Sequence, residues 1–137
     1  MQPVRLPKPV TIPQGRTFVW KVGRGVARRD DDGNVLYDNL GRPLSDPVDL
    51  TGYSARMQIR ETVDSDDTIA DLTSATSHLV VDGPAGTVTV TIPADETGLF
   101  DFVSAVADIE AYRVVGGEEI VLGIVAFRAV LDREVTR

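Results

Sequence analysis

The residues of this chain that could do chemistry are few and stand apart from one another. The sequence holds one histidine, His78, and no cysteine. Without cysteine, a disulfide framework, a thiolate metal site and a cysteine nucleophile are all excluded. A metal site or a hydrolytic triad needs partners at a defined geometry, and a lone histidine specifies neither. We therefore expect His78 to be a surface or edge residue at the start of a strand.

An acidic segment, RRDDDGNVLYD, invites comparison with a calcium-binding loop because Asp30, Asp32 and Asn34 alternate. The EF-hand loop requires D-x-[DN]-x-[DN]-G and a glutamate at position 12. Here Gly33 falls between the second and third candidate ligands, and position 12 is Gly41, so the match fails. We predict an acidic hairpin tip, since Asp, Asn and Gly are ordinary turn residues. The same interpretation applies to a second acidic cluster, Asp64, Asp66 and Asp67.

No other segment carries a catalytic or cofactor motif. The basic, glycine-containing stretch GRGVARR (residues 23–29) does not lead from a strand into a helix, as a phosphate-binding loop would. A Walker loop, a dinucleotide fingerprint and a nucleophile elbow are absent from the sequence. Since no nucleophile, acid/base pair or metal set can be named, we predict a protein that is not an enzyme and uses no cofactor.

Charge is distributed unevenly along the chain, whose net charge is −7. Residues 1–29 hold seven Lys/Arg and no acid, whereas residues 61–119 hold thirteen Asp/Glu and one Arg. Such asymmetry indicates either nucleic-acid binding or contact between the basic arm of one copy and the acidic body of another. The acidic body would repel a phosphate backbone, and Phe18 and Trp20 suit a core better than a base-stacking platform. We therefore expect protein partners and no nucleic acid.

The N-terminal residues 1–15 are predicted to form an extended basic arm, because Pro3, Pro7, Pro9 and Pro13 exclude a helix. The arm either docks on another subunit, which the charge pattern favours, or covers its own domain. On the first interpretation, deleting residues 1–15 leaves the domain folded. The sequence shows no signal-peptide pattern and no apolar run long enough to span a membrane, so we expect a protein made in the cytoplasm.

Alternation of apolar and polar residues predicts a series of short strands in a single domain, residues 16–137. The clearest strand is 53–60, where every second residue from Tyr53 to Ile59 faces one side. In the first strand, 16–23, Trp20 is expected to anchor the core. One helical turn is expected within 93–100. Further strands are expected at 68–72, 79–81, 87–92, 105–111 and 120–131, the last with Val121, Gly123, Val125, Phe127, Ala129 and Leu131 on one face.

This spacing of strands and turns predicts an all-β sandwich or small barrel. The polar segment 24–48 interrupts it and is predicted to project as a β-hairpin or long ordered loop. Loops of this length in a compact domain are usually functional or flexible.

The segment DLTGYSARMQIRE (residues 49–61) resembles a segment of small tail-associated virion proteins of siphophages and prophages, a family that includes the N-terminal domain of baseplate upper proteins. Other segments agree with the family in the same order along residues 12–23 and 49–137. They are a strand at 17–22, a G-x-V-x-V-x-I strand at 86–92, a turn at 96–99, ADIEAY at 107–112 and EVTR at 134–137. The resemblance implies an immunoglobulin-like antiparallel β-sandwich, to which the arm and the 24–48 insertion are added.

The resemblance also implies a non-enzymatic virion protein that assembles as a homo-oligomer and bridges phage components. A tail or baseplate position is favoured over a head decoration or head–tail connector role. A receptor- or carbohydrate-binding module is an alternative of another class, and it would need exposed aromatic rings. The residues expected to bind neighbouring subunits are Arg5, Lys8 and Arg16 on the arm, and Arg24, Arg28, Arg29 and the exposed ring of Tyr37 on the insertion.

Overall fold

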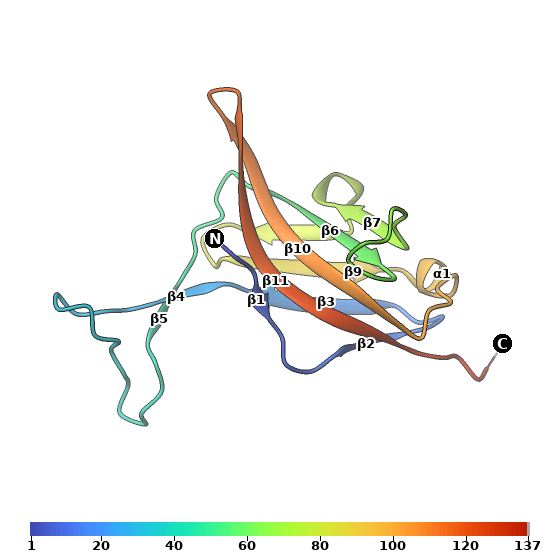
Figure 1. Cartoon of the computed structure of the whole chain (residues 1–137), viewed down its shortest axis with the longest axis horizontal. Helices are drawn as coiled ribbons and strands as arrows, with labels where there is room; N and C mark the ends of the chain where they lie inside the picture. Colours follow the sequence, from blue (N-terminus) through green and yellow to red (C-terminus); the bar gives the residue numbers. More distant parts are fainter. Residues whose placement is uncertain (137) are drawn as a thin grey trace.

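The protein folds as two facing β-sheets with a projecting insertion, as a computed structural model that describes residues 1–136 shows (Figure 1). The predicted all-β sandwich is confirmed. Arg137, the last residue of the segment EVTR, lies outside the described residues. Within residues 1–136, no helix is both long enough and apolar enough to cross a bilayer.

The larger sheet has the strand order β1–β11–β10–β6–β7, with β2 also paired to β11. The smaller sheet has the order β3–β9–β8, and β4 and β5 form a separate two-stranded ribbon. Two short helical turns are present, a 3₁₀ turn at Ser74–Thr76 and the expected single turn α1 at Ala94–Thr97. The strands are β1 (Val4–Arg5), β2 (Val10–Pro13), β3 (Phe18–Gly23), β4 (Gly25–Ala27), β5 (Ser45–Pro47), β6 (Ser54–Arg60), β7 (Ala70–Thr73), β8 (Leu79–Asp82), β9 (Thr87–Ile92), β10 (Ser104–Val115) and β11 (Glu118–Asp132).

The core lies between the two sheets and follows from the alternation in the sequence. On β6, Ala55, Met57 and Ile59 are fully buried, whereas the residues between them reach the outer face. Trp20 of the smaller sheet packs edge-on against Phe127 of the larger sheet, with ring centroids 5.0 Å apart. The predicted role of Trp20 as a core anchor is thereby confirmed, since this contact joins the two sheets.

The predicted facing of β11 is wrong at its N-terminal half because the strand contains a β-bulge. Ile109 of β10 pairs with Val125, but the next residue, Glu110, pairs with Gly123, which leaves Ile124 as the extra residue. One extra residue reverses the facing of everything on one side of it. Before the bulge, Leu122 rather than Val121 therefore packs against the core.

The N-terminal arm is extended, but it lies on its own domain rather than leaving it. Both β1 and β2 pair in parallel with β11, and Ile12 is fully buried. Gly123 permits this docking, because a Cβ at that position would lie 2.5 Å from the backbone nitrogen of Pro3. Of the two alternatives for the arm, this chain shows the one in which the arm covers its own domain. Deletion of residues 1–15 is now expected to uncover the core.

Candidate interaction surfaces

The insertion, residues 24–48, forms a three-way junction of short hairpins rather than a single hairpin. Its stem is the β4–β5 pair, in which Val26 lies opposite Asp46. Beyond the stem, the backbone N–H of Leu36 donates to Arg28 O, that of Leu44 to Leu36 O, and that of Arg28 to Leu44 O, each at 2.9 Å. These three bonds close a ring. Two lobes leave the ring and point away from the sandwich (Figure 1).

Both lobes end in the same turn, built on the shared pattern D-x-x-G. Asp30 Oδ1 accepts hydrogen bonds from the N–H groups of Asp32 (3.0 Å) and Asn34 (2.9 Å). Asp38 Oδ1 accepts equivalent bonds from Leu40 and Arg42, both at 2.9 Å. Gly33 and Gly41, with φ of 87° and 76°, occupy the left-handed position that each turn requires.

These N–H donors also set the ionisation of the two turn aspartates. The Asn34 N–H lowers the pKa of Asp30, and the Arg42 N–H lowers that of Asp38, because each bond favours the charged carboxylate. Each carboxylate is therefore used to hold its own turn. Among residues 1–136, no group of three or more His, Asp or Glu side chains is placed to hold a metal ion.

The insertion exposes apolar side chains, and apart from Val48 at its root it packs none of them against the core. Leu40, at one tip, is 77% exposed, and Tyr37 is 60% exposed, as the sequence predicted for this ring. Val26 and Leu36 are also exposed. A segment that is ordered by hydrogen bonds yet presents large apolar groups to water has the character of a contact surface.

Three of the predicted binding cations are engaged within the chain. Arg16 pairs with Asp132 at 3.0 Å, and Arg28 pairs with Asp46 at 2.8 Å. Arg29 donates from Nη1 to Gly33 O at 2.8 Å. Exposed pairs of this kind contribute about 0–1 kcal/mol, so they orient the side chains at little energetic cost to any later partner.

The other three predicted cations have no ion pair with residues 1–136. Arg5 and Lys8 lie on the outside of the arm. Arg24 stands at the root of the insertion, where its N–H donates to Gly86 O and its carbonyl accepts from Val48. Its Nε and Nη1 atoms are buried without a hydrogen-bond partner among the described residues. Burial of these two nitrogens without an acceptor carries a desolvation cost.

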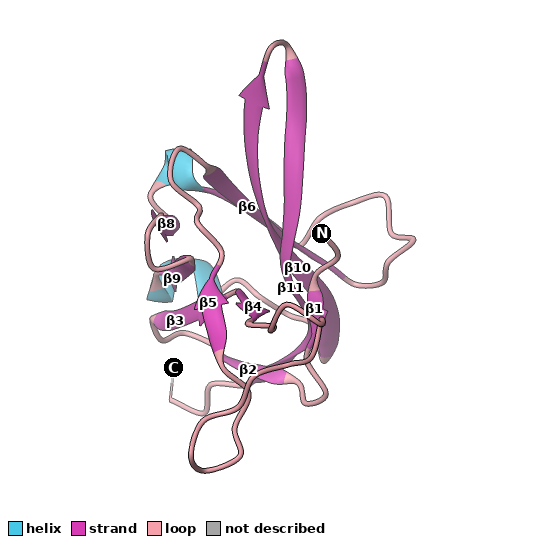
Figure 2. Ribbon diagram, turned by 90° about the vertical axis from the view of Figure 1, so that its left-hand side faces the viewer, coloured by secondary structure: helices cyan, strands magenta, loops and turns pink. Residues whose placement is uncertain are grey.

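The end of the β10–β11 ribbon is a second projecting surface. It was not predicted from the sequence as a contact surface. It extends beyond the sheet and ends in the expected turn at Gly116 and Gly117 (Figure 2). Val114, 65% exposed, and its neighbours Val115 and Ile120 are accessible there. The signal was present in the sequence as apolar residues on both sides of a two-glycine turn.

Arginines brace the base of this ribbon. Arg56 lies 4.6 Å from the ring centroid of Tyr112 and forms ion pairs with Glu110 (2.9 Å) and Glu119 (3.0 Å). The hydrogen bond that Arg56 donates to Glu110, supported by the one to Glu119, raises the pKa of its guanidinium. Arg113 covers the ring of Tyr53 at 4.9 Å. Cation–π contacts and ion pairs together stabilise the position of the ribbon relative to the sheet.

His78 has two partners that the sequence did not indicate. Its Nε2 lies 2.6 Å from Glu96 Oε2, and its Nδ1 lies 2.7 Å from Thr76 Oγ1. This order of hydroxyl, imidazole and carboxylate resembles a hydrolytic relay, but the Thr76 hydroxyl also bonds Thr73 O at 2.9 Å and caps the 3₁₀ turn. The arrangement ties that turn to α1. Glu96 is 18 residues from His78, so only the fold brings them together.

The fold class that these observations define is an all-β sandwich with a docked N-terminal arm and two projecting hairpin elements. No protein-family model matches the chain. No curated protein matches it either.

A solved structure is similar over nearly the whole chain, the N-terminal domain of phage TP901-1 ORF48. The match has a TM-score of 0.50 at 11% sequence identity and covers 95% of this chain and 94% of that chain. It shows that the two share a fold over nearly the whole of both chains. In fold, this match agrees with the resemblance to phage proteins that was noted from the sequence.

Proposed function

We propose that this protein is a structural virion protein of a tailed bacteriophage, a tail or baseplate component that assembles as an oligomer. The sandwich is a rigid scaffold without a catalytic role. The insertion bridges to neighbouring subunits, and the docked arm adds its outer cations, Arg5 and Lys8, to the contact surface.

The observation that carries this proposal is the likeness in fold to a phage domain over nearly all of both chains. Two features of the molecule support it. The insertion and the turn end of the β10–β11 ribbon both present exposed apolar residues, such as Leu40 and Val114, that take no part in the buried core. Extended elements that project from a rigid sandwich are suited to contacts between subunits.

The arm supports assembly as the edge of a sheet and not as a free extended segment. Its main chain is bonded to β11 on one side, so β1 and β2 form the edge of the larger sheet. Strand edges offer N–H and C=O groups to a further chain. Residues such as Val4, exposed on this edge, are where a neighbour would add to the sheet.

Localisation on particles tests the proposal. Phage particles from a lysate that contains the protein would be purified and labelled with an antibody against the chain for electron microscopy. We expect label at the tail end. Label over the head would favour a head decoration or connector role instead, and absence of the chain from particles would contradict the proposal. Glycan binding by free protein that depends on Tyr37 would favour the receptor-binding alternative.

A further inference from the structure

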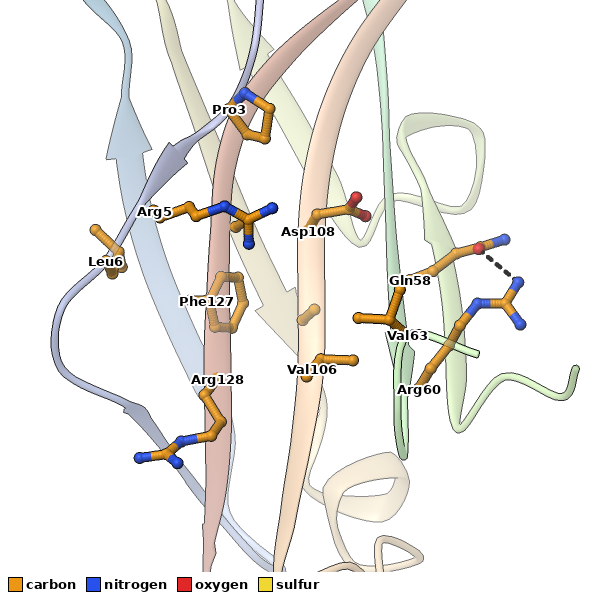
Figure 3. A pocket seen from close by; sticks show the side chains of 12 residues that line it. Pro3, Arg5, Leu6, Gln58, Arg60, Val63, Val106, Asp108, Phe127 and Arg128 are labelled. Carbon is orange, nitrogen blue, oxygen red and sulfur yellow. Dashed lines mark hydrogen bonds between the residues drawn. The ribbon is translucent and has the colours of Figure 1, made fainter. Parts of the chain in front are cut away.

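A groove of about 460 Å³ crosses the outer face of the larger sheet (Figure 3). Arg5 and Leu6, from β1 and the residue after it, form one wall, and Arg60 and Val63 form the other. Val106 of β10 and Ala126 of β11 give the floor an apolar centre. The groove thus lies between the docked arm and the turn that follows β6.

The charged groups of the groove are three arginines and one aspartate, a net charge of +2 from Arg5, Arg60, Arg128 and Asp108. Arg60 is held by Gln58 Oε1 (3.0 Å) and by the carbonyls of Ser65 (2.7 Å) and Asp66 (3.0 Å). Arg5 and Arg128 form no ion pair or side-chain hydrogen bond with any residue of 1–136, and neither does Asp108. The groove therefore offers two uncommitted cations and one uncommitted anion beside an apolar floor.

Asp108 carries an electrostatic cost in this groove. Burial raises the pKa of its carboxyl, and the nearby carboxylate of Glu110 raises it further. The cations of Arg56 and Arg60 offset this in part. A further cation placed beside Asp108 would reduce the same cost.

The first insertion tip, residues 29–34, has the opposite charge pattern. It holds one arginine, Arg29, and three aspartates, a net charge of −2. Only Asp30 uses its carboxylate within the turn, whereas the side chains of Asp31 and Asp32 accept no hydrogen bond from residues 1–136. Because the insertion points away from the sandwich, the tip of one copy reaches a groove only on another copy (Figure 1).

We propose that the tip 29–34 of one copy docks in the groove of a second copy, with Asp31 and Asp32 against Arg5 and Arg128 and Arg29 against Asp108. The inference rests on the proposed function, since it names the partner of the insertion. The tip and the groove are different surfaces, so each copy uses both and the contact repeats head to tail. Such a heterologous contact produces a ring when its rotation closes.

Sedimentation velocity of the full-length protein over a range of concentrations and salt tests this contact. We expect wild-type association that weakens as salt rises, because the contact is largely electrostatic. Arg128→Glu in the groove and Asp32→Lys in the tip should each weaken association by about tenfold or more, since like charges then face one another. Circular dichroism would verify that both variants remain folded.

Mixing the two variants gives the sharpest result. The lysine introduced in the tip of one variant then meets the glutamate introduced in the groove of the other. The unchanged tip and the unchanged groove also meet, so the mixture should associate although neither variant does alone. Lys21→Glu and Asp95→Lys are the matched controls, because they reverse exposed charges on β3 and α1, outside the groove, the arm, the insertion and the ribbon end. They should leave association at the wild-type level.

Three results would overturn the proposal: a wild-type protein that stays monomeric at all concentrations, variants that associate as the controls do, or a mixture that fails to recover. If groove variants are lost from phage particles while tip variants are retained, the occupant is an acidic segment of another protein. Each of these results leaves the proposed place in the virion standing, because that place is tested by the presence of wild-type chain in particles.

Discussion

The sandwich and the insertion are both made of short β segments, but different forces hold them. The sandwich buries apolar side chains on both facing sheets, and Met57, Ile59 and Ile109 have no exposed surface. The insertion has no fully buried apolar side chain, and it is ordered by a ring of backbone hydrogen bonds and by two aspartate-capped turns. Hydrophobic burial makes the sandwich rigid, whereas local hydrogen bonds shape the insertion without covering its apolar groups.

Because of this difference, substitutions in the sandwich and in the insertion should have different effects, the first on stability and the second on assembly. A substitution in the sandwich removes burial energy and changes the free energy of unfolding. A substitution in the insertion removes little burial energy, so under the proposed function we expect its effect to fall on contacts with partners.

Ile59→Ala tests the sandwich at its centre. Ile59 is fully buried on β6, and removal of its side chain leaves a cavity between the sheets. We expect a loss of about 4 kcal/mol in the free energy of unfolding, measured by urea titration. Val80→Ala is the control, because Val80 is 61% exposed on β8 and its truncation should cost under about 0.5 kcal/mol. Equal losses for the two variants would contradict the assigned core.

Ile12→Ala tests whether the arm belongs to the sandwich. Ile12 is fully buried where β2 pairs with β11, and we expect a loss of about 2–3 kcal/mol, smaller than at Ile59 because the chain end can readjust. Lys8→Ala, on the exposed part of the arm, is the control. If Ile12→Ala unfolds at the same urea concentration as the control, the arm does not dock on its own domain in solution.

The arm shows where prediction from sequence reached its limit. Four prolines correctly indicate an extended chain, because they restrict local conformation. They carry no information on which surface the chain covers. That depends on a distant residue, Gly123, whose missing side chain lets Pro3 approach β11. The strand β6 was predictable in full, since its alternation and its burial express the same periodicity.

The candidate surfaces also differ in how far the sequence could predict them. The acidic tip and the exposed Tyr37 followed from turn chemistry in the local sequence. The groove did not, because Arg5, Arg60 and Arg128 come from three segments that only the sheet order brings together. The bulge in β11 was equally hidden, since an apolar run such as residues 120–127 does not show where one residue is left unpaired.

Asp30→Ala combined with Asp38→Ala tests the insertion turns. We expect local loosening of both tips, seen by NMR as faster amide exchange at Asn34 and Arg42, with the urea midpoint unchanged. Asp64→Ala together with Asp67→Ala is the control, since both lie in an acidic turn outside the insertion. A large fall in global stability would show that the insertion is part of the cooperative unit of the sandwich.

Acid should have the same local effect in the wild-type protein. The folded pKa of Asp30 and Asp38 is lowered, so their contribution is present above the ordinary aspartate pKa of about 3.9. It is lost as the pH falls through the lowered folded value. Amide signals of the two tips should therefore change at acidic pH before those of the sandwich do, and a single concerted change would contradict the separation.

Asp108→Asn should give the smallest effect, and in the stabilising direction. Because the folded pKa of Asp108 is raised, its charged form opposes folding at neutral pH, and this cost disappears once the pH is low enough to protonate the group in both states. We expect a slightly higher melting temperature at pH 7 and no difference near pH 3. Asp31→Asn, at an exposed tip, should change neither value.

In the function proposed above, the sandwich is a scaffold and the insertion carries assembly. Replacement of residues 27–45 by Asn-Gly separates these two roles, because Val26 and Asp46 are paired and a two-residue turn can join them. A phage that lacks its own copy would be supplied with this chain, and incorporation into particles would be measured by mass spectrometry. We predict a melting temperature within about 3 °C of wild type and incorporation reduced by about tenfold or more. Wild-type incorporation of the folded variant would contradict the claim.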